Sequence, residues 1–198
     1  MSALFRILTF AAIAFLAASS SPDLNAAILG FQSDYAPGNW TSIPGTGSIN
    51  TSSAPGSVSL TSGNLGSFSN TDFTISLTSA GTLSFDWSYV TTDTLGPNYD
   101  QFGYLLNAVF TQLSNNAGLN SQSGIISIPV SATNSFGFRQ NTIDGLSGAA
   151  TTTISNFSGP GAASSVVPEP ASASLLVLGT LIGAFWQFRK RRQAAIVG

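Results

Sequence analysis

The stretch TDFTISLTSAGTLSFDWSYV, residues 71–90, holds two runs in which apolar and polar residues alternate. In the first run Phe73, Ile75 and Leu77 fall on one side of an extended chain. The apolar side of the second run is formed by Leu83, Phe85, Trp87 and Tyr89. A period of two is the pattern of a β-strand with one buried face. The stretch therefore predicts two strands, each with its aromatic and aliphatic side turned toward a core.

Similar short runs, separated by Gly, Pro, Asn and Ser, continue on both sides of this stretch. They are GSVSLTS (56–62), FGYLLNAVFTQL (102–113), GIISIPVS (124–131), SFGFRQ (135–140) and ATTTISNF (150–157). Short strands in this arrangement predict an all-β fold, an antiparallel β-sandwich of jelly-roll type over residues 27–157. Pro129 cannot donate a ladder hydrogen bond, so its strand is expected at a sheet edge or with a bulge. Residues 158–167, SGPGAASSVV, are expected to be a flexible linker.

The charges are few and unevenly distributed. Only 7% of the residues are charged, against about 25% in an average soluble domain. Between residues 28 and 166 there are six aspartates and one basic residue, Arg139, which leaves five net negative charges. We expect Arg139 to pair with one of these aspartates. Nucleic acid is excluded as a partner, because phosphate binding needs a basic surface.

The N-terminus, MSALFRILTFAAIAFLAASSSPDLNAAILGF, has the three parts of a secretory signal peptide. Arg6 precedes an apolar run over residues 7–18, and small residues follow. This run is shorter than the roughly 20 residues that span a bilayer. Residues 1–26 are therefore expected to be a signal peptide with a signal helix, cleaved after Ser20 or Ala26, and export would use Sec-type machinery and signal peptidase. An uncleaved anchor helix is the alternative.

The C-terminus has the features of a membrane anchor. Residues 171–188 contain no charge and would measure about 27 Å as a helix, which just spans a bilayer. The basic cluster that follows consists of Arg189, Lys190, Arg191 and Arg192. Basic residues stay on the cytoplasmic side of a membrane, so the β-sandwich is expected outside the inner membrane as an ectodomain. Residues 193–198 would then be a short cytoplasmic tail.

Pro168, Glu169 and Pro170 stand directly before this apolar run. Pro170 suits the first turn of a helix and pushes Glu169 into an extended conformation. A stiff, singly charged peptide just outside the bilayer is a shape that a membrane-embedded processing enzyme could recognise. The plainer interpretation is that the two prolines only end the linker and begin the helix.

The order VPEP, apolar helix, RKRR, together with a signal peptide, resembles the PEP-CTERM sorting segment of bacterial surface proteins. The resemblance covers residues 168–192. It implies an exosortase that recognises Pro168, Glu169 and Pro170, removes the helix at residues 171–188 and passes the ectodomain to the cell surface, often in bacteria that make exopolysaccharide. Arg189 to Arg192 would be the cytoplasmic stop. The chain departs from the pattern in the six residues QAAIVG after the basic cluster and in Gln187 within the apolar run.

The composition excludes the common catalytic systems. The chain has no His and no Cys, which removes Ser-His-Asp and Cys-His nucleophiles and the usual zinc ligands. Glu169, its only glutamate, belongs to the sorting segment, so an acid/base pair would have to consist of two aspartates. We expect no catalytic residues and no enzyme activity, with an aspartate-dependent glycoside hydrolase as a remote alternative.

The loop TTDTLGPNYDQF, residues 91–102, is a candidate calcium site, because Asp93, Asn98 and Asp100 supply oxygen ligands around a Gly-Pro turn. Asp and Asn also favour turns, which explains them without a metal. No other cofactor is expected.

Aromatic residues near loops suggest a second kind of site. Trp40, Tyr99 and Tyr104 lie nearer to expected loops than the rings of residues 82–90, and flat rings can stack on sugars. They are candidate sugar contacts.

Taken together, the sequence predicts a single-pass inner-membrane precursor that becomes a cell-surface or extracellular protein. The predicted role is structural or matrix-associated. The alternative is a carbohydrate-binding β-sandwich module with exopolysaccharide as its partner.

Overall fold

The computed structural model describes residues 26–161. The N-terminal part contains β1 (Ala27–Leu29), two 3₁₀ helices, η1 (Ser33–Tyr35) and η2 (Pro37–Asn39), then β2 (Thr41–Ile43), β3 (Ser48–Asn50) and β4 (Ser57–Thr61). The remaining strands are β5 (Ser69–Ser76), β6 (Gly81–Thr91), β7 (Phe102–Leu106), β8 (Val109–Gln112), β9 (Ser121–Val130), β10 (Ser135–Thr142) and β11 (Ala150–Pro160).

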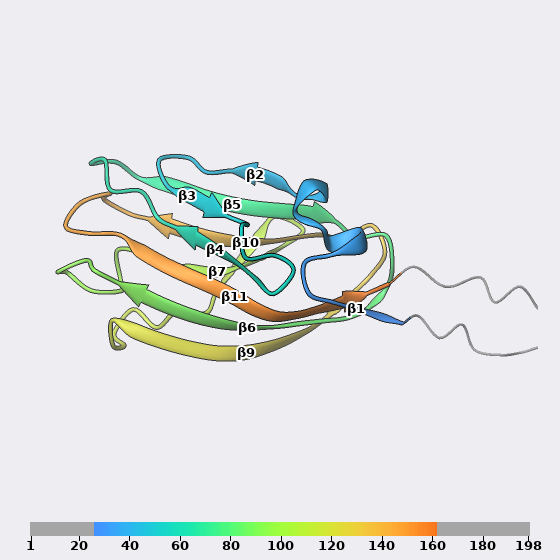
Figure 1. The fold of residues 1–198 in the computed structure, drawn as a ribbon. Helices are drawn as coiled ribbons and strands as arrows, with labels where there is room; N and C mark the ends of the chain where they lie inside the picture. The colour runs from blue at the N-terminus through green and yellow to red at the C-terminus, as the bar shows by residue number, and fades with distance from the viewer. Residues whose placement is uncertain (1–25, 162–198) are drawn as a thin grey trace, which may run out of the picture. The chain divides into compact units, whose positions relative to one another are not determined.

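The strands form two antiparallel sheets packed face to face (Figure 1). Sheet A has the order β3-β4-β11-β6-β9, with β1 pairing with the end of β11, and sheet B has the order β2-β5-β10-β7-β8. This confirms the predicted all-β antiparallel sandwich, while the jelly-roll subtype remains a prediction. Within residues 26–161 no helix has the length and apolar character needed to cross a membrane. The predicted signal helix, transmembrane helix, sorting motif and basic cluster lie outside the described residues.

The alternating runs fill the core as predicted. Phe73 and Ile75 of β5 are buried, and so is Leu77, the first residue after β5. The four apolar residues of β6 are buried too. The two sheets meet at aromatic pairs such as Phe85 and Phe138, whose ring centroids lie 5.0 Å apart at 87°. Aromatic pairs of this kind contribute about 0.5–1.5 kcal/mol each beyond the area that they bury. The sandwich is therefore held together by ring packing, without disulfides.

The predicted edge position of Pro129 is confirmed, because β9 is the last strand of sheet A. The predicted boundary of the linker is wrong. Ser158, Gly159 and Pro160 belong to β11, where they pair with Leu29, Ile28 and Ala27. Their Ser-Gly-Pro composition suggests a linker, but β1 offers them a strand partner that no local sequence signal reveals.

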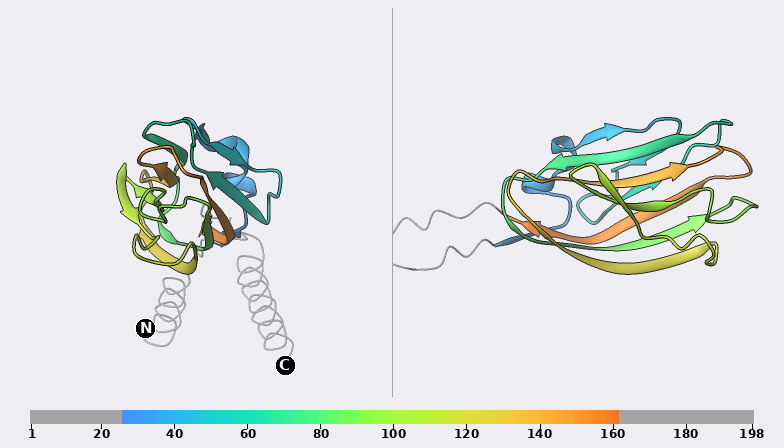
Figure 2. Two further views of the ribbon diagram at one scale, coloured as in Figure 1. Left: turned by 90° about the vertical axis from the view of Figure 1, so that its left-hand side faces the viewer. Right: turned by 180° about the vertical axis from the view of Figure 1, so that it is seen from behind.

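The described chain begins and ends side by side. The amide of Gly161 donates to the carbonyl of Ala26 at 3.2 Å, and both ends leave the sandwich at the same end (Figures 1 and 2). The loops of residues 62–68, 92–101, 113–120 and 143–149 gather at the opposite end, because Thr61, Val90 and Ser121 line up with one another across β11 and β6. Leu24–Ser164 cluster as one compact unit with its own core, so this unit is expected to fold when expressed alone.

Candidate functional site

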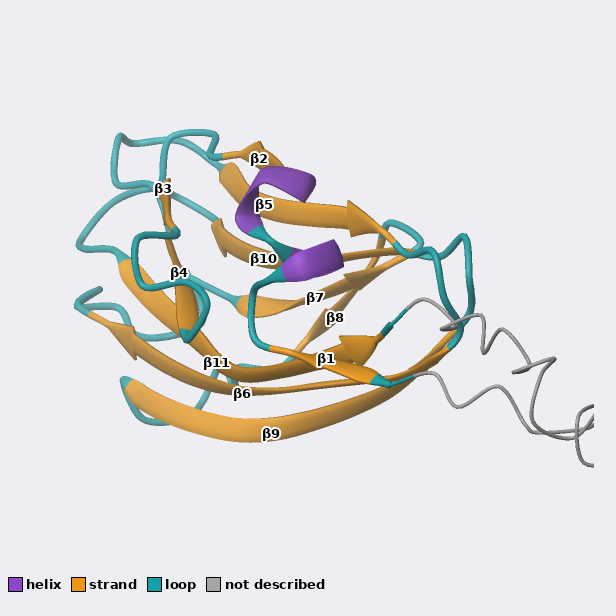
Figure 3. Cartoon of the chain, turned by 45° about the vertical axis from the view of Figure 1, so that its right-hand side comes forward, coloured by secondary structure: helices purple, strands orange, loops and turns teal. Residues whose placement is uncertain are grey.

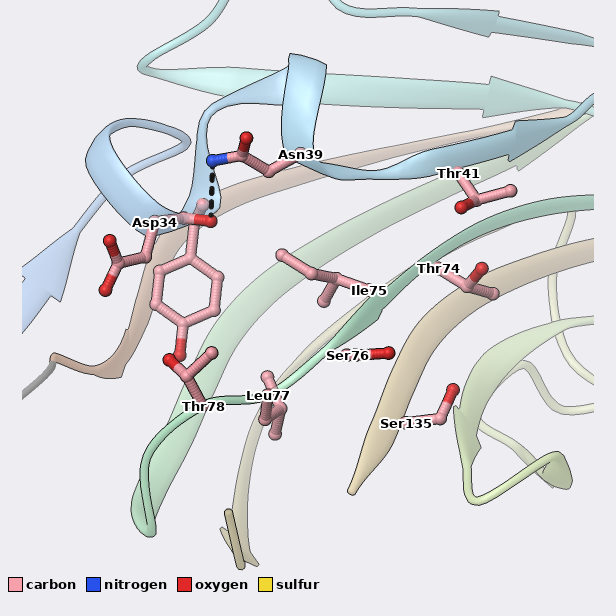
Figure 4. Close-up of a pocket in the computed structure, with 10 residues that line it drawn as sticks. Asp34, Asn39, Thr41, Thr74, Ile75, Ser76, Leu77, Thr78 and Ser135 are labelled. Atoms are coloured by element: carbon pink, nitrogen blue, oxygen red, sulfur yellow. Dashed lines mark hydrogen bonds between the residues drawn. The ribbon is translucent and has the colours of Figure 1, made fainter. Parts of the chain in front are cut away.

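A pocket of ≈ 600 Å³ opens beside the end of β5, along which the neighbouring strand β2 does not extend. β2 pairs with β5 only over three residues, and its first residue, Thr41, lies opposite Thr74. β5 continues to Ser76, and beside this last part of the strand lies the turn segment of η1 and η2 in place of a paired strand. Figure 3 shows this segment beside β1 and β5. Pro37 and Gly38 favour such turns and not a strand. Because no strand pairs with this end of β5, a hollow remains there (Figure 4).

Hydroxyl groups surround the pocket. They belong to Thr41, Thr74, Ser76, Thr78 and Ser135, and Figure 4 shows them on two sides of the hollow. Within the described residues none of these five hydroxyls makes a hydrogen bond to another protein group. They are therefore ready to bond water or a ligand, and a ligand would break no internal bond to reach them.

Three buried apolar side chains, Ile75, Leu77 and Tyr35, also line the pocket. Ile75 and Leu77 lie on the face of β5 opposite to Thr74 and Ser76. The hydroxyl of Tyr35 donates to the carbonyl of Pro160 at 3.0 Å, which fixes the ring against β11. Burial, and to a smaller extent the charge of Asp34, raises the pKa of Tyr35 to about 12. Tyr35 is therefore neutral at any physiological pH and works as a packing surface.

Asp34 and Asn39 complete the pocket. The amide nitrogen of Asn39 donates to the carbonyls of Ser33 and Asp34, at 3.0 and 3.1 Å. These bonds hold the segment of η1 and η2 in place and leave the amide oxygen of Asn39 for a ligand (Figure 4). The side chain of Asp34 is exposed, and it is the only ionisable group of the pocket besides Tyr35.

The prediction that Trp40 contacts sugar is wrong. Trp40 is only 6% exposed, and its ring stacks on Phe73 at 4.6 Å and on Phe138 at 5.6 Å. Its indole nitrogen donates to the carbonyl of Tyr35 at 3.0 Å, which satisfies the one polar atom of the side chain. The loop residues around Trp40 predict an exposed ring, but packing between the two sheets buries it.

Tyr99 and Tyr104 are half-buried and do not form a platform with Trp40. Tyr104 points from β7 toward the core and stacks on Phe136, with centroids 6.3 Å apart. Tyr99 lies in the loop after β6, where its carbonyl accepts a bond from the amide of Ile143. The structure thus does not bring the three predicted aromatic residues together at one surface.

Two of the three predicted calcium ligands are buried together at the end opposite the termini. Asp93 and Asp100 have no exposed surface, whereas Asn98 is exposed. Within residues 26–161 no three His, Cys, Asp or Glu side chains are close enough to hold a metal. Of the predicted set of Asp93, Asn98 and Asp100, the structure buries the two aspartates and leaves Asn98 at the surface.

Burial raises the pKa of Asp100 to about 6, and the neighbouring charges of Asp93 and Asp144 act in the same direction. The hydroxyls of Ser62 and Thr142 oppose this rise. A substrate cannot reach two carboxylates that have no exposed surface, so this pair has no access for acid/base chemistry.

No known protein family's sequence profile matches the chain, and no curated protein is similar to it in sequence. Among solved structures, the chain is similar to the N-terminal cellulose-binding domain of a β-1,4-glucanase C from Cellulomonas fimi. The identity is 12%, 71% of this chain and 97% of that one are covered, and the TM-score is 0.38. A CBM35 from Cellvibrio japonicus Abf62 gives 16% identity, coverage of 69% and 98%, and a TM-score of 0.35.

A third similar structure is a carbohydrate binding module from Cellvibrio mixtus lichenase 5A in complex with cellotriose. It gives 10% identity, coverage of 66% and 96%, and a TM-score of 0.32. At these scores the likenesses are weak, and the function proposed below rests on the pocket beside β5.

Proposed function

We propose that this chain is an exported protein, sorted to the bacterial surface or matrix, whose β-sandwich binds a neutral polysaccharide in the pocket beside β5. The observation that carries this proposal is the set of five hydroxyls without protein partners around a pocket that Ile75, Leu77 and Tyr35 also line. A sugar ring presents hydroxyls at its rim and C–H groups on its faces. Pockets of about 300–1,000 Å³ with apolar floors and a few polar groups are typical ligand sites.

The charge of the pocket favours a neutral glycan. Asp34 carries the only carboxylate among the residues that line the pocket, and residues 26–161 contain six aspartates against one arginine. An anionic polysaccharide would be repelled by this field, whereas the carboxylate of Asp34 can accept hydrogen bonds from neutral sugar hydroxyls.

Export and sorting are proposed from the order of segments in the sequence. Cleavage after Ala26 would leave a mature chain that begins directly on β1, at Ala27. At the other end β11 stops at Pro160, so residues 161–167 separate the last strand from Pro168. A processing enzyme at Pro168-Glu169-Pro170 would then act on the chain outside the folded sandwich.

A structural matrix role without a specific ligand is the second candidate. The observation in its favour is the outer face of sheet A, where Ser59, Thr153, Ser88 and Ser123 lie side by side across β4, β11, β6 and β9. This row of four hydroxyl side chains carries no charge, so it would be hydrated and weakly adhesive within a polysaccharide gel.

Affinity electrophoresis of the Leu24–Ser164 unit through gels that contain neutral glucans, mannans or galactans tests the first candidate. The pocket variant Thr74→Val/Ser76→Ala/Ser135→Ala removes three hydroxyls that have no protein partner, so it should fold normally. Each lost hydrogen bond costs about 0.5–1.5 kcal/mol, so the triple variant should bind at least about tenfold more weakly.

The matched control is Ser59→Ala/Ser88→Ala/Ser123→Ala on the outer face of sheet A, which should bind like the wild type. Retardation that is lost in this control and kept in the pocket variant would favour the second candidate. An absence of retardation by every neutral glycan would contradict the proposed binding.

A further inference from the structure

At the end opposite the termini, two buried carboxylate oxygens have no hydrogen-bond partner: Oδ2 of Asp93 and Oδ1 of Asp100. Both residues have no exposed surface. The other oxygen of Asp93 accepts a bond from the amide of Leu95 at 2.6 Å. Buried polar atoms are almost always paired, and a buried charge is normally paired or coordinates a metal. Within residues 26–161 no protein donor lies at hydrogen-bond distance from either oxygen, which leaves both oxygens free to bind a cation.

Further oxygens surround the same place. The hydroxyl of Thr91 accepts a bond from the amide of Asp93 at 3.0 Å and lies 3.5 Å from Oδ2 of Asp100. The hydroxyls of Ser62 and Thr142 are also close enough to Asp100 to lower its pKa. Each of them already accepts a backbone bond at 2.9 Å, from Ala150 and Gly145 respectively. The hydroxyl of Thr91 thus lies next to both aspartates, and those of Ser62 and Thr142 lie next to Asp100.

The position of Asp100 is set by the core and not by the loop alone. Its carbonyl accepts hydrogen bonds from the hydroxyl of Tyr89 at 2.8 Å and from the amide of Gln140 at 3.2 Å. The hydroxyl of Thr152 donates to Gln140 at 2.7 Å, which fixes that amide in turn. Three strands, β6, β10 and β11, therefore hold the backbone of Asp100 in place.

We propose that Asp93 and Asp100 bind one calcium ion between these two unpartnered oxygens. A site built only from oxygen donors selects a hard cation, and calcium accepts carboxylate, hydroxyl, carbonyl and water oxygens in irregular shells. Because only two carboxylates contribute, the affinity should resemble that of extracellular calcium modules, with a Kd of about 10⁻⁴–10⁻³ M. The site lies at the end of the sandwich away from the proposed sugar pocket, so the two proposals stand independently.

The test is calcium binding to the Leu24–Ser164 unit, first freed of metal with a chelator. Isothermal titration with calcium chloride should show one ion per chain, and about 10 mM calcium should raise the melting temperature by several degrees. Magnesium should have a smaller effect, because it demands a regular octahedral shell. The variants Asp93→Asn and Asp100→Asn should each lose the binding heat and the thermal shift.

The matched control is Asp86→Asn, which removes the same charge from the outer face of sheet A and should keep both signals. The site would be overturned by a wild-type unit that shows neither heat nor thermal shift at about 10 mM calcium. It would also be overturned by calcium binding that persists in both site variants, since the ion would then bind elsewhere. If one variant fails to fold, the wild-type titration and the other variant still decide.

Discussion

The guanidinium of Arg139 donates to both carboxylate oxygens of Asp72, from Nε to Oδ1 at 2.7 Å and from Nη2 to Oδ2 at 2.6 Å. The two residues lie opposite each other on β10 and β5, on the outer face of sheet B. The ring of Phe110 lies 5.9 Å from the guanidinium carbon. This geometry confirms the expected ion pair of the one basic residue in the sandwich.

Removing one member of this pair should cost more than removing both. Arg139→Met leaves the carboxylate of Asp72, a buried residue, without its donors, which should lower the free energy of unfolding by about 1–3 kcal/mol. The double variant Arg139→Met/Asp72→Leu should recover part of this loss. Urea denaturation of the two single variants and the double variant gives the coupling. Losses that simply add would show that the pair is not coupled.

The stability of the calcium-free unit should fall as the pH rises from about 4 to above 6. The pKa of Asp100 is raised from 3.8 to about 6 on folding. A raised folded-state pKa favours the folded state fully below the unfolded pKa, and this contribution is lost as the pH rises through the folded pKa. The loss amounts to at most about 3 kcal/mol.

The variant Asp100→Asn isolates this effect. In chelator, its stability relative to the wild type should increase between pH 4 and pH 7, measured by urea midpoints at each pH. A constant difference over this range would contradict the burial of an ionisable Asp100.

Trp40 should behave as a core residue and not as a ligand contact. Trp40→Ala removes a ring stacked between Phe73 and Phe138 and should cost about 3–5 kcal/mol. Trp40→Phe keeps most of the packing but loses the bond to Tyr35, so it should cost clearly less. Thermal or urea unfolding checks this order. A Trp40→Ala variant as stable as the wild type would mean that the ring is exposed.

Gly159 in β11 packs against the ring of Tyr35, which lines the pocket. A Cβ at this position would clash with the ring of Tyr35, and the bond from Tyr35 to Pro160 prevents the ring from moving away. Gly159→Ala should therefore destabilise the unit by about 1–3 kcal/mol and weaken glycan binding. Gly38→Ala, where a Cβ meets nothing within 4 Å, is the control. Equal effects of both substitutions on stability and binding would contradict this packing.

The sequence predicts the sandwich well because alternation reports directly which side of a strand is buried. The buried faces of residues 73–77 and 83–89 and the edge position of Pro129 follow from single strands read alone. The predictions are wrong where contacts with residues far along the chain determine whether a residue is in a strand or buried. Pro160 is a strand residue because Ala27 pairs with it, and Trp40 is buried because Phe73 and Phe138 enclose it.

The pocket could not be predicted for the same reason. It needs the turn segment of residues 33–39 beside the end of β5, and no periodicity links Asp34 or Asn39 to Thr74. The sequence does predict Asp93 and Asp100 as candidate calcium ligands, because both carboxylates lie in one loop. The neighbours of Asp100, Ser62 directly after β4 and Thr142 at the end of β10, lie far from this loop in the sequence and carry no local signal.

Titration of the isotopically labelled Leu24–Ser164 unit with a neutral oligosaccharide, followed through its backbone amide resonances, is the most direct test of the proposed binding site. The proposal predicts shifts confined to the amides of residues 34–41 and 74–78 and of Ser135, and their loss in the Thr74→Val/Ser76→Ala/Ser135→Ala variant. Shifts that concentrate instead on the outer face of sheet A, or an absence of shifts with every neutral glycan tried, would contradict it.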